Sequence, residues 1–174
     1  MSETLPHPDL QFLYELWSAK RNGKAMPSRS DLDPLEIPGR LWPHIMVVAV
    51  VRAGEHLRFQ YRRVGGEFAA AFGRDPTGRF FDEVLPARGG YRDYVLNLYG
   101  RIVTRRSATY SENTFTLAGQ ATPRLTRRLS LPLSNDGETV DTVFTAHIFE
   151  LPRSTDQRPI EPSSFIEVRE LELD

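Results

Sequence analysis

The sequence contains no cysteine. Disulfide bridges, thiolate metal sites and cysteine nucleophiles are therefore excluded, as is any flavin or chromophore attached through a thiol. A membrane span of about 18 apolar residues is missing as well, because the longest apolar run, residues 45–51, has the length of a strand. The first residues lack the basic and apolar regions of a signal peptide, so a cytoplasmic protein without membrane attachment is expected.

A strong excess of charge is absent too. The 174 residues include 22 basic and 23 acidic side chains, which gives a net charge of −1 at pH 7. The molecule as a whole is therefore not attracted to nucleic acid or to an anionic membrane, and neither is expected as a partner. Three arginine pairs, at 62–63, 105–106 and 127–128, indicate either solvated faces or contacts with an acidic tail or partner.

Apolar residues at helical spacing predict a first helix, with Asp9 as its N-cap and the pair Asn22-Gly23 at its end. The apolar stripe is wide, and a helix of this kind usually buries two sides. We expect the stripe to form a surface for a second copy or for a signalling partner; the alternative is that both sides pack within the chain. The residues of this expected surface are Leu10, Leu13, Tyr14 and Trp17.

The order of the remaining elements predicts an α+β fold. Prolines punctuate residues 24–43, which are expected to form a loop, and the alternating residues 44–52 and 57–62 predict a hairpin. Helices are predicted over 67–72, 80–84 and 91–105, and strands over 109–117, 124–133 and 139–151. The domain limits are thus 1–25 for the first helix, 26–151 for the α+β domain and 152–174 for a polar, acidic tail. Within this tail, residues 165–173 are expected to dock as a strand, to dock as a helix or to stay loose.

Five strands with helices inserted after the second leave a space between one sheet face and those helices. Aromatic residues fall in the segments expected to line it, which suits a small apolar or aromatic ligand and equally suits a filled core. His147 either contacts a ligand there or is a satisfied structural histidine. The expected pocket residues are Phe59, Phe68, Phe72, Phe81, Tyr94, Leu98, Phe115, Phe144 and His147.

Sequence patterns for catalysis and metal binding are weak. Residues 73–79 (GRDPTGR) lack the lysine of a phosphate-binding loop and predict a turn, in which Asp75 or Thr77 caps backbone amides and Gly78 takes an unusual dihedral angle. The sequence Gly-x-Ser-x-Gly does not occur, and no spacing of histidine and carboxylate suggests a metal site. We therefore expect no catalytic residue and no bound metal.

Three runs, in this order and spacing, resemble a PAS domain, in particular the single-domain PAS proteins of alphaproteobacteria. They are residues 26–37 (MPSRSDLDPLEI), 59–65 (FQYRRVG) and 72–79 (FGRDPTGR), together with Trp17 and the turn at 20–24. The resemblance covers roughly residues 10–150. One departure is Gly65-Gly66, where glycine followed by threonine or serine is more usual, and this widens the turn or leaves one cap unmade.

The resemblance implies a five-stranded antiparallel sheet in the order 2-1-5-4-3, with helices on one face and the first helix on the other. PAS domains sense ligands, light or redox state and mediate dimerisation, and they are rarely enzymes. Haem in PAS domains is usually coordinated by a histidine on a helix. Residues 91–105 contain no histidine, so haem is not expected, and the cofactor stays unknown.

Three functions are compatible with the sequence. The first is a stand-alone sensory or adaptor module that binds a small ligand, a partner protein or both. The second is a structural interaction module, a dimerisation domain with a packed core and no ligand. The third, a small-molecule enzyme of cystatin-like shape, needs an acid and a base on facing strands, and the sequence offers no convincing pair.

Overall fold

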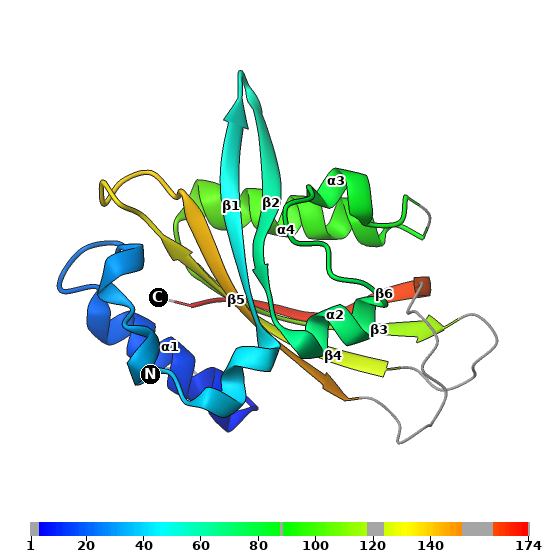
Figure 1. Cartoon of the computed structure of the whole chain (residues 1–174), viewed down its shortest axis with the longest axis horizontal. Helices are drawn as coiled ribbons and strands as arrows, with labels where there is room; N and C mark the ends of the chain where they lie inside the picture. The colour runs from blue at the N-terminus through cyan, green and yellow to red at the C-terminus, as the bar shows by residue number, and fades with distance from the viewer. Residues whose placement is uncertain (1–3, 88, 118–123, 151–161, 174) are drawn as a thin grey trace.

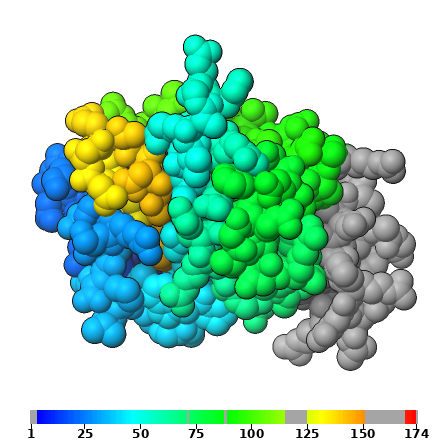
Figure 2. Space-filling view, turned by 45° about the horizontal axis from the view of Figure 1, so that its top comes forward, coloured from blue at the N-terminus to red at the C-terminus, as the bar shows by residue number. Residues whose placement is uncertain are grey.

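The computed structural model describes residues 4–87, 89–117, 124–150 and 162–173, and its centre is an antiparallel sheet of six strands (Figure 1). The hairpin of the first two strands projects beyond the body of the molecule (Figures 1 and 2). Along the sheet the order is β2-β1-β5-β4-β3-β6. The strands are β1 (Ile45–Ala53), β2 (His56–Val64), β3 (Ala108–Leu117), β4 (Arg124–Leu133), β5 (Thr142–Glu150) and β6 (Pro162–Leu173).

The sixth strand corrects the expected five-stranded sheet. β6 pairs with β3 from Leu117↔Pro162 to Ala108↔Leu173 and so adds a strand beyond the expected order. Of the alternatives for residues 165–173 of the expected tail, docking as a strand is the one that the structure supports. The alternation of its residues explains why it docks. Leu173 is buried, while Glu170 and Glu172, the charged residues that alternate with the leucines, form ion pairs with the helix α4 (Tyr91–Arg105).

Strand alternation gives the sheet two faces. Val48 pairs with Tyr61 on one side and with Val143 on the other, so these three residues share the face that we call the inner face. Val47 and Phe144, one position away, pair with each other on the opposite face, the outer face.

Three helices cover the inner face: α2 (Gly66–Phe72), α3 (Phe81–Val84) and α4. In α4 the apolar residues recur every three to four positions, and the stripe from Tyr94 to Ile102 is buried. The Tyr99 hydroxyl lies 2.8 Å from the Thr145 Oγ1 atom, which fixes α4 over β5.

The outer face is covered by α1 (Pro8–Lys20) and by the segment that follows it, which forms three 3₁₀ helices, η1 (Arg29–Asp31), η2 (Pro34–Glu36) and η3 (Gly39–His44). The Trp17 indole donates a hydrogen bond of 2.9 Å to the Pro132 carbonyl of β4. An ion pair of 2.6 Å between Lys20 and Glu36 ties α1 to η2.

The position of α1 contradicts the expected partner surface. The side chains of Leu10, Leu13, Tyr14 and Trp17 are at most 7% exposed, because they belong to the core that this chain forms with its own sheet. The alternative, packing within the chain, is the one that the structure supports. The start of the helix also differs from the expectation: His7 is the N-cap, and its Nδ1 atom accepts a hydrogen bond from the Asp9 amide.

The two glycine-containing turns around β2 have clear physical reasons. A Cβ atom at Gly65 would lie 2.2 Å from the Pro43 carbonyl oxygen, so only glycine fits there, whereas Gly66 faces open space. In the turn at 73–79, the Asp75 carboxylate accepts from the Thr77 amide at 2.9 Å and Gly78 has a φ of 85°. The prediction of a turn in place of a phosphate-binding loop is confirmed.

Candidate functional site

The layer between the inner face and the helices has two halves, and the first is aromatic. Phe81 of α3 lies 5.7 Å from Phe59, 4.5 Å from Tyr61 and 4.9 Å from Tyr99, measured between ring centroids. All four rings are at most 2% exposed. This aromatic half is therefore a packed core, and the predicted pocket residues Phe59 and Phe81 fill it.

The second half is polar, although it is equally buried. Strand register brings its side chains together, because Ser111 pairs with Arg128, Arg128 with His147, and Ser130 with Thr145. Each residue of this polar half is at most 7% exposed. Its members are Thr109, Ser111 and Asn113 of β3, Thr126, Arg128 and Ser130 of β4, and Thr145 and His147 of β5.

Arg128 is the centre of the polar half, and its hydrogen-bond partners are neutral. Its Nε atom donates to the His147 Nε2 atom at 3.0 Å, its Nη1 atom to the Ser111 hydroxyl at 3.4 Å and its Nη2 atom to the Tyr91 hydroxyl at 3.2 Å. Within the described ranges, no aspartate or glutamate forms an ion pair with it. The positive charge of Arg128 is therefore uncompensated. This is unfavourable, because a guanidinium is always charged and is costly to bury without a counter-ion.

The acid nearest to Arg128 in strand register is already engaged. Glu170 of β6 pairs with Ser111, which itself pairs with Arg128, so the three residues form one row across the sheet. The Glu170 carboxylate accepts two hydrogen bonds from Arg101 of α4, at 3.1 Å and 2.5 Å. The neighbouring cation on this face is thus neutralised, in contrast to Arg128.

Two buried side chains of the polar half have polar atoms without a hydrogen-bond partner. They are Asn113, at both amide atoms, and His147, at Nδ1. Because Arg128 can only donate, His147 accepts at Nε2 and carries its proton on Nδ1. Burial, with Arg128 and His44 nearby, holds the pKa of His147 well below its ordinary value, so the ring is neutral at pH 7. The Nδ1–H group is then a free donor.

Aromatic rings adjoin this free donor. Phe68 of α2 lies 5.0 Å from the His147 ring, and Phe149 stacks on it at 5.7 Å with an interplanar angle of 7°. Phe72 stacks on Phe68 in turn, at 5.7 Å. The polar half therefore combines one cation, unpartnered donors and acceptors, and an apolar wall. Buried polar groups in native proteins nearly always have partners, so this combination is what a site for a small ligand offers.

The structure places the predicted pocket residues unevenly. Phe68, Phe72 and His147 lie together beside Arg128, and Tyr94 and Leu98 are buried on α4. Phe144 is a correction: because Thr145 faces α4, its neighbour Phe144 faces the outer side of the sheet. The side chain of Phe115 lies outside the described residues.

Sequence reasoning missed the residues that carry the site, namely Arg128, Ser111 and Asn113. The available signal was the alternation of polar residues along β3, which indicates a face but does not show that helices cover it. The pair Arg127-Arg128 was interpreted as either a solvated face or a contact with an acidic tail or partner, whereas Arg128 is 1% exposed and has neutral hydrogen-bond partners.

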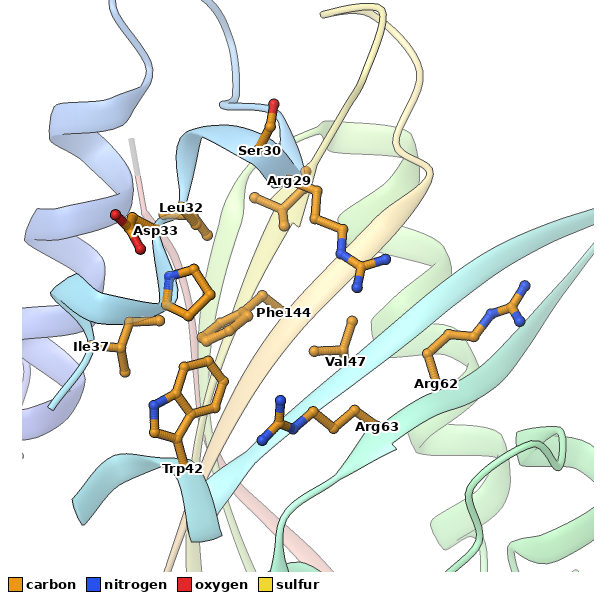
Figure 3. A pocket seen from close by; sticks show the side chains of 12 residues that line it. Arg29, Ser30, Leu32, Asp33, Ile37, Trp42, Val47, Arg62, Arg63 and Phe144 are labelled. Atoms are coloured by element: carbon orange, nitrogen blue, oxygen red, sulfur yellow. The ribbon is translucent and has the colours of Figure 1, made fainter. Parts of the chain in front are cut away.

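A second feature is a groove of about 420 Å³ on the outer face, between η1, η2 and η3 on one side and β1, β2, β4 and β5 on the other (Figure 3). Val47, Phe144 and Leu133 contribute apolar side chains to its lining. Arg29, Arg62 and Arg63 surround it, and none of the three forms an ion pair with a described residue. The Arg63 guanidinium lies 4.7 Å from the centroid of the Trp42 ring.

Among the described side chains, no group of three or more histidine, aspartate or glutamate residues is placed to hold a metal ion. Nor is any helix in the described part of the chain long and apolar enough to cross a bilayer.

Comparison with known proteins agrees with the architecture. A search of curated proteins finds no match. A family model described as a PAS domain matches residues 5–146, a range that begins before α1 and extends into β5. The match covers most of the chain, and the first five strands lie in the order β2-β1-β5-β4-β3 that the resemblance implied, with β6 added at the edge. The chain belongs to the PAS domain family.

Proposed function

We propose that this PAS domain is a sensory module, not an enzyme, and that it binds a small ligand in the polar half of the inner layer. The observation that supports the proposal best is the unpartnered set of buried polar atoms on Asn113 and His147 beside Arg128. Occupancy of the site would change the packing of α2 against β5, through Phe68, and so bias contact with a partner protein.

The alternative function, a structural interaction module with a filled core, fits only the aromatic half. There the side chains of Phe59 and Phe81 have no polar atom, and both contact Tyr61 or each other through their rings. A filled core does not account for the polar half, because an apolar side chain in place of Asn113 would serve such a core better.

The test is native mass spectrometry of the purified protein beside its denatured mass. We expect an added mass under native conditions that disappears on denaturation and that Asn113→Leu loses. Asn135→Leu is the matched control, because it makes the same change at an exposed turn residue. A wild-type protein without added mass, whose melting temperature is also unchanged by a small-molecule extract of the host cells, contradicts the proposal.

The outer groove supports a second candidate function, the docking of a partner. Three arginines that form no ion pair with a described residue outnumber the one acid of the lining, Asp33, and are complementary to an acidic segment that carries an aliphatic or aromatic anchor. This groove takes the place of the surface expected on α1, whose residues are buried. The proposed occupant is therefore an acidic, apolar-anchored peptide segment of a signalling partner.

A fluorescein-labelled peptide of alternating glutamate and leucine is the probe for the groove. We expect binding that weakens at least tenfold in Arg62→Glu, whose side chain lines the groove, and that weakens as salt is raised. Arg92→Glu, on α4 at the other side of the sheet, is the charge-matched control and should bind as the wild type does. If both variants lose peptide affinity equally, the effect is one of net charge, and the groove is not the binding site.

A further inference from the structure

The charge of the polar half identifies the chemistry of its ligand. We infer that the ligand is a small monocarboxylate with an apolar body, and that Arg128 is the counter-ion of its carboxylate. The inference rests on the proposed function, since it names the ligand class of the same site.

The first step of the argument is charge balance. Arg128 is 1% exposed, its hydrogen-bond partners His147, Ser111 and Tyr91 are neutral, and no described acid pairs with it. Transfer of a charged group out of water is unfavourable unless an opposite charge accompanies it. A bound anion supplies that charge, and a carboxylate suits a guanidinium because its two oxygens match the planar donors.

The second step concerns the number of charges. Arg101, the neighbouring cation in the row, already holds Glu170, so one positive charge is left to neutralise. A singly charged carboxylate balances it, whereas a phosphate, with a charge of about −1.5 to −2 near pH 7, would leave negative charge in the same buried layer.

The third step is the supply of hydrogen bonds. A guanidinium has five N–H donors, and the bonds of Arg128 to His147, Ser111 and Tyr91 engage three of these five, one on each nitrogen atom. The Nδ1–H of His147 and the amide of Asn113 are unpartnered. A carboxylate has two oxygens with about four acceptor positions, which matches this group of donors.

The fourth step concerns the body of the ligand. Phe68 and Phe149 lie 5.0 Å and 5.7 Å from the His147 ring, and Phe72 stacks on Phe68. These rings offer an apolar wall next to the donors. An aromatic or aliphatic acid uses both features, since its carboxylate faces Arg128 and its hydrocarbon part faces the rings.

The first experiment compares two probes of nearly equal shape, benzoate and benzamide, by thermal unfolding at constant ionic strength and pH 7.5. We expect millimolar benzoate to raise the melting temperature by several degrees and benzamide to leave it unchanged, because only benzoate carries the compensating charge. Arg128→Met should lose the response to benzoate. If benzamide stabilises the protein as well as benzoate does, the inference is overturned.

The second experiment builds the missing charge into the chain. Ser111→Asp places a carboxylate beside Arg128, whose Nη1 atom lies 3.4 Å from the Ser111 hydroxyl, and Ser111→Asn is its uncharged isostere. We expect the first variant to melt at a higher temperature than the second and to be unresponsive to benzoate. An equal or lower melting temperature than that of Ser111→Asn overturns the inference, whether or not benzoate binds.

The outcomes separate the inference from the proposed function. If native mass spectrometry shows a bound neutral molecule that Asn113→Leu releases, the sensory site stands and the carboxylate fails. If the wild type binds nothing and Ser111→Asp gives no gain over Ser111→Asn, both fail. If Ser111→Asp is stabilised but the wild-type protein binds neither benzoate nor hexanoate, the inference of a ligand with an apolar body is rejected.

Discussion

The aromatic half and the polar half of the inner layer share one strand, β5, yet they satisfy their side chains in different ways. Val143 of β5 is fully buried in the same cross-strand row as Tyr61, with Val48 of β1 between them, and its apolar side chain is stabilised by packing alone. Four residues along the same strand, His147 is equally buried but depends on hydrogen bonds, one of which is missing. Equal burial therefore does not mean equal completeness, and the incomplete half is the one to examine for function.

The largest effect is expected from Phe81→Ala in the aromatic half. This change removes a ring that contacts Phe59, Tyr61 and Tyr99, and it should lower the free energy of unfolding by about 3–5 kcal/mol in urea denaturation. Phe12→Ala, at a residue that is 38% exposed, is the control and should cost less than about 1 kcal/mol. A small decrease in the free energy of unfolding for Phe81→Ala would show that the aromatic half is loosely packed, and the two halves would then not differ in completeness.

The second effect is a pH dependence that belongs to the polar half. The pKa of His147 is lowered in the folded protein, mainly by burial, so the unfolded chain binds a proton first as the pH falls below about 6.5. Stability should therefore be complete above that pH and decline by about 1.4 kcal/mol per pH unit below it from this group. Urea denaturation at pH 7.5, 6.5 and 5.5 measures the decline, and His147→Gln should show a shallower one.

A third, smaller effect is expected where the halves meet. Tyr99→Phe removes the hydroxyl that lies 2.8 Å from the Thr145 Oγ1 atom. Thr145 is fully buried, and its other side-chain contact, to the Ser130 hydroxyl, is longer at 3.5 Å. The free energy of unfolding should therefore fall by about 1 kcal/mol in urea denaturation. An unchanged midpoint would mean that the junction does not depend on this bond.

The smallest effect concerns an ion pair outside both halves. Arg105→Ala breaks its contact of 2.8 Å with Glu172 of β6, where both side chains are about half exposed. Solvent screens such a pair, so the cost should be at most about 0.5–1 kcal/mol in thermal unfolding, and it should shrink further in high salt. A larger cost would make this pair a main attachment of β6.

The sequence predicted the elements better than it predicted the site. The residues expected for α4 and β4 match the structure, because long periodic runs have one consistent solution. Alternation also shows which residues of a strand share a face, but not which face the helices cover. That is why Phe144 was expected in the inner pocket. It is also why a buried position for Arg128 was not among the two interpretations of its pair, a solvated face or a contact with an acidic tail or partner, since the helix that carries Tyr91 is distant in sequence.

The covering of the sheet edges has a consequence for self-association. An uncovered edge strand is a template on which another chain can add a strand. β6 pairs along the free side of β3, and on β2 the Tyr61 backbone bonds to Gly78 and Arg79 at 2.7 Å and 3.0 Å. The chain's own backbone thus covers β3 and part of β2, and β6 becomes the edge strand at its end of the sheet, where its alternating charged residues disfavour the addition of another strand. Detachment of β6 would expose β3 to exchange with another copy, so the attachment of that one strand sets how well the protein resists strand swapping.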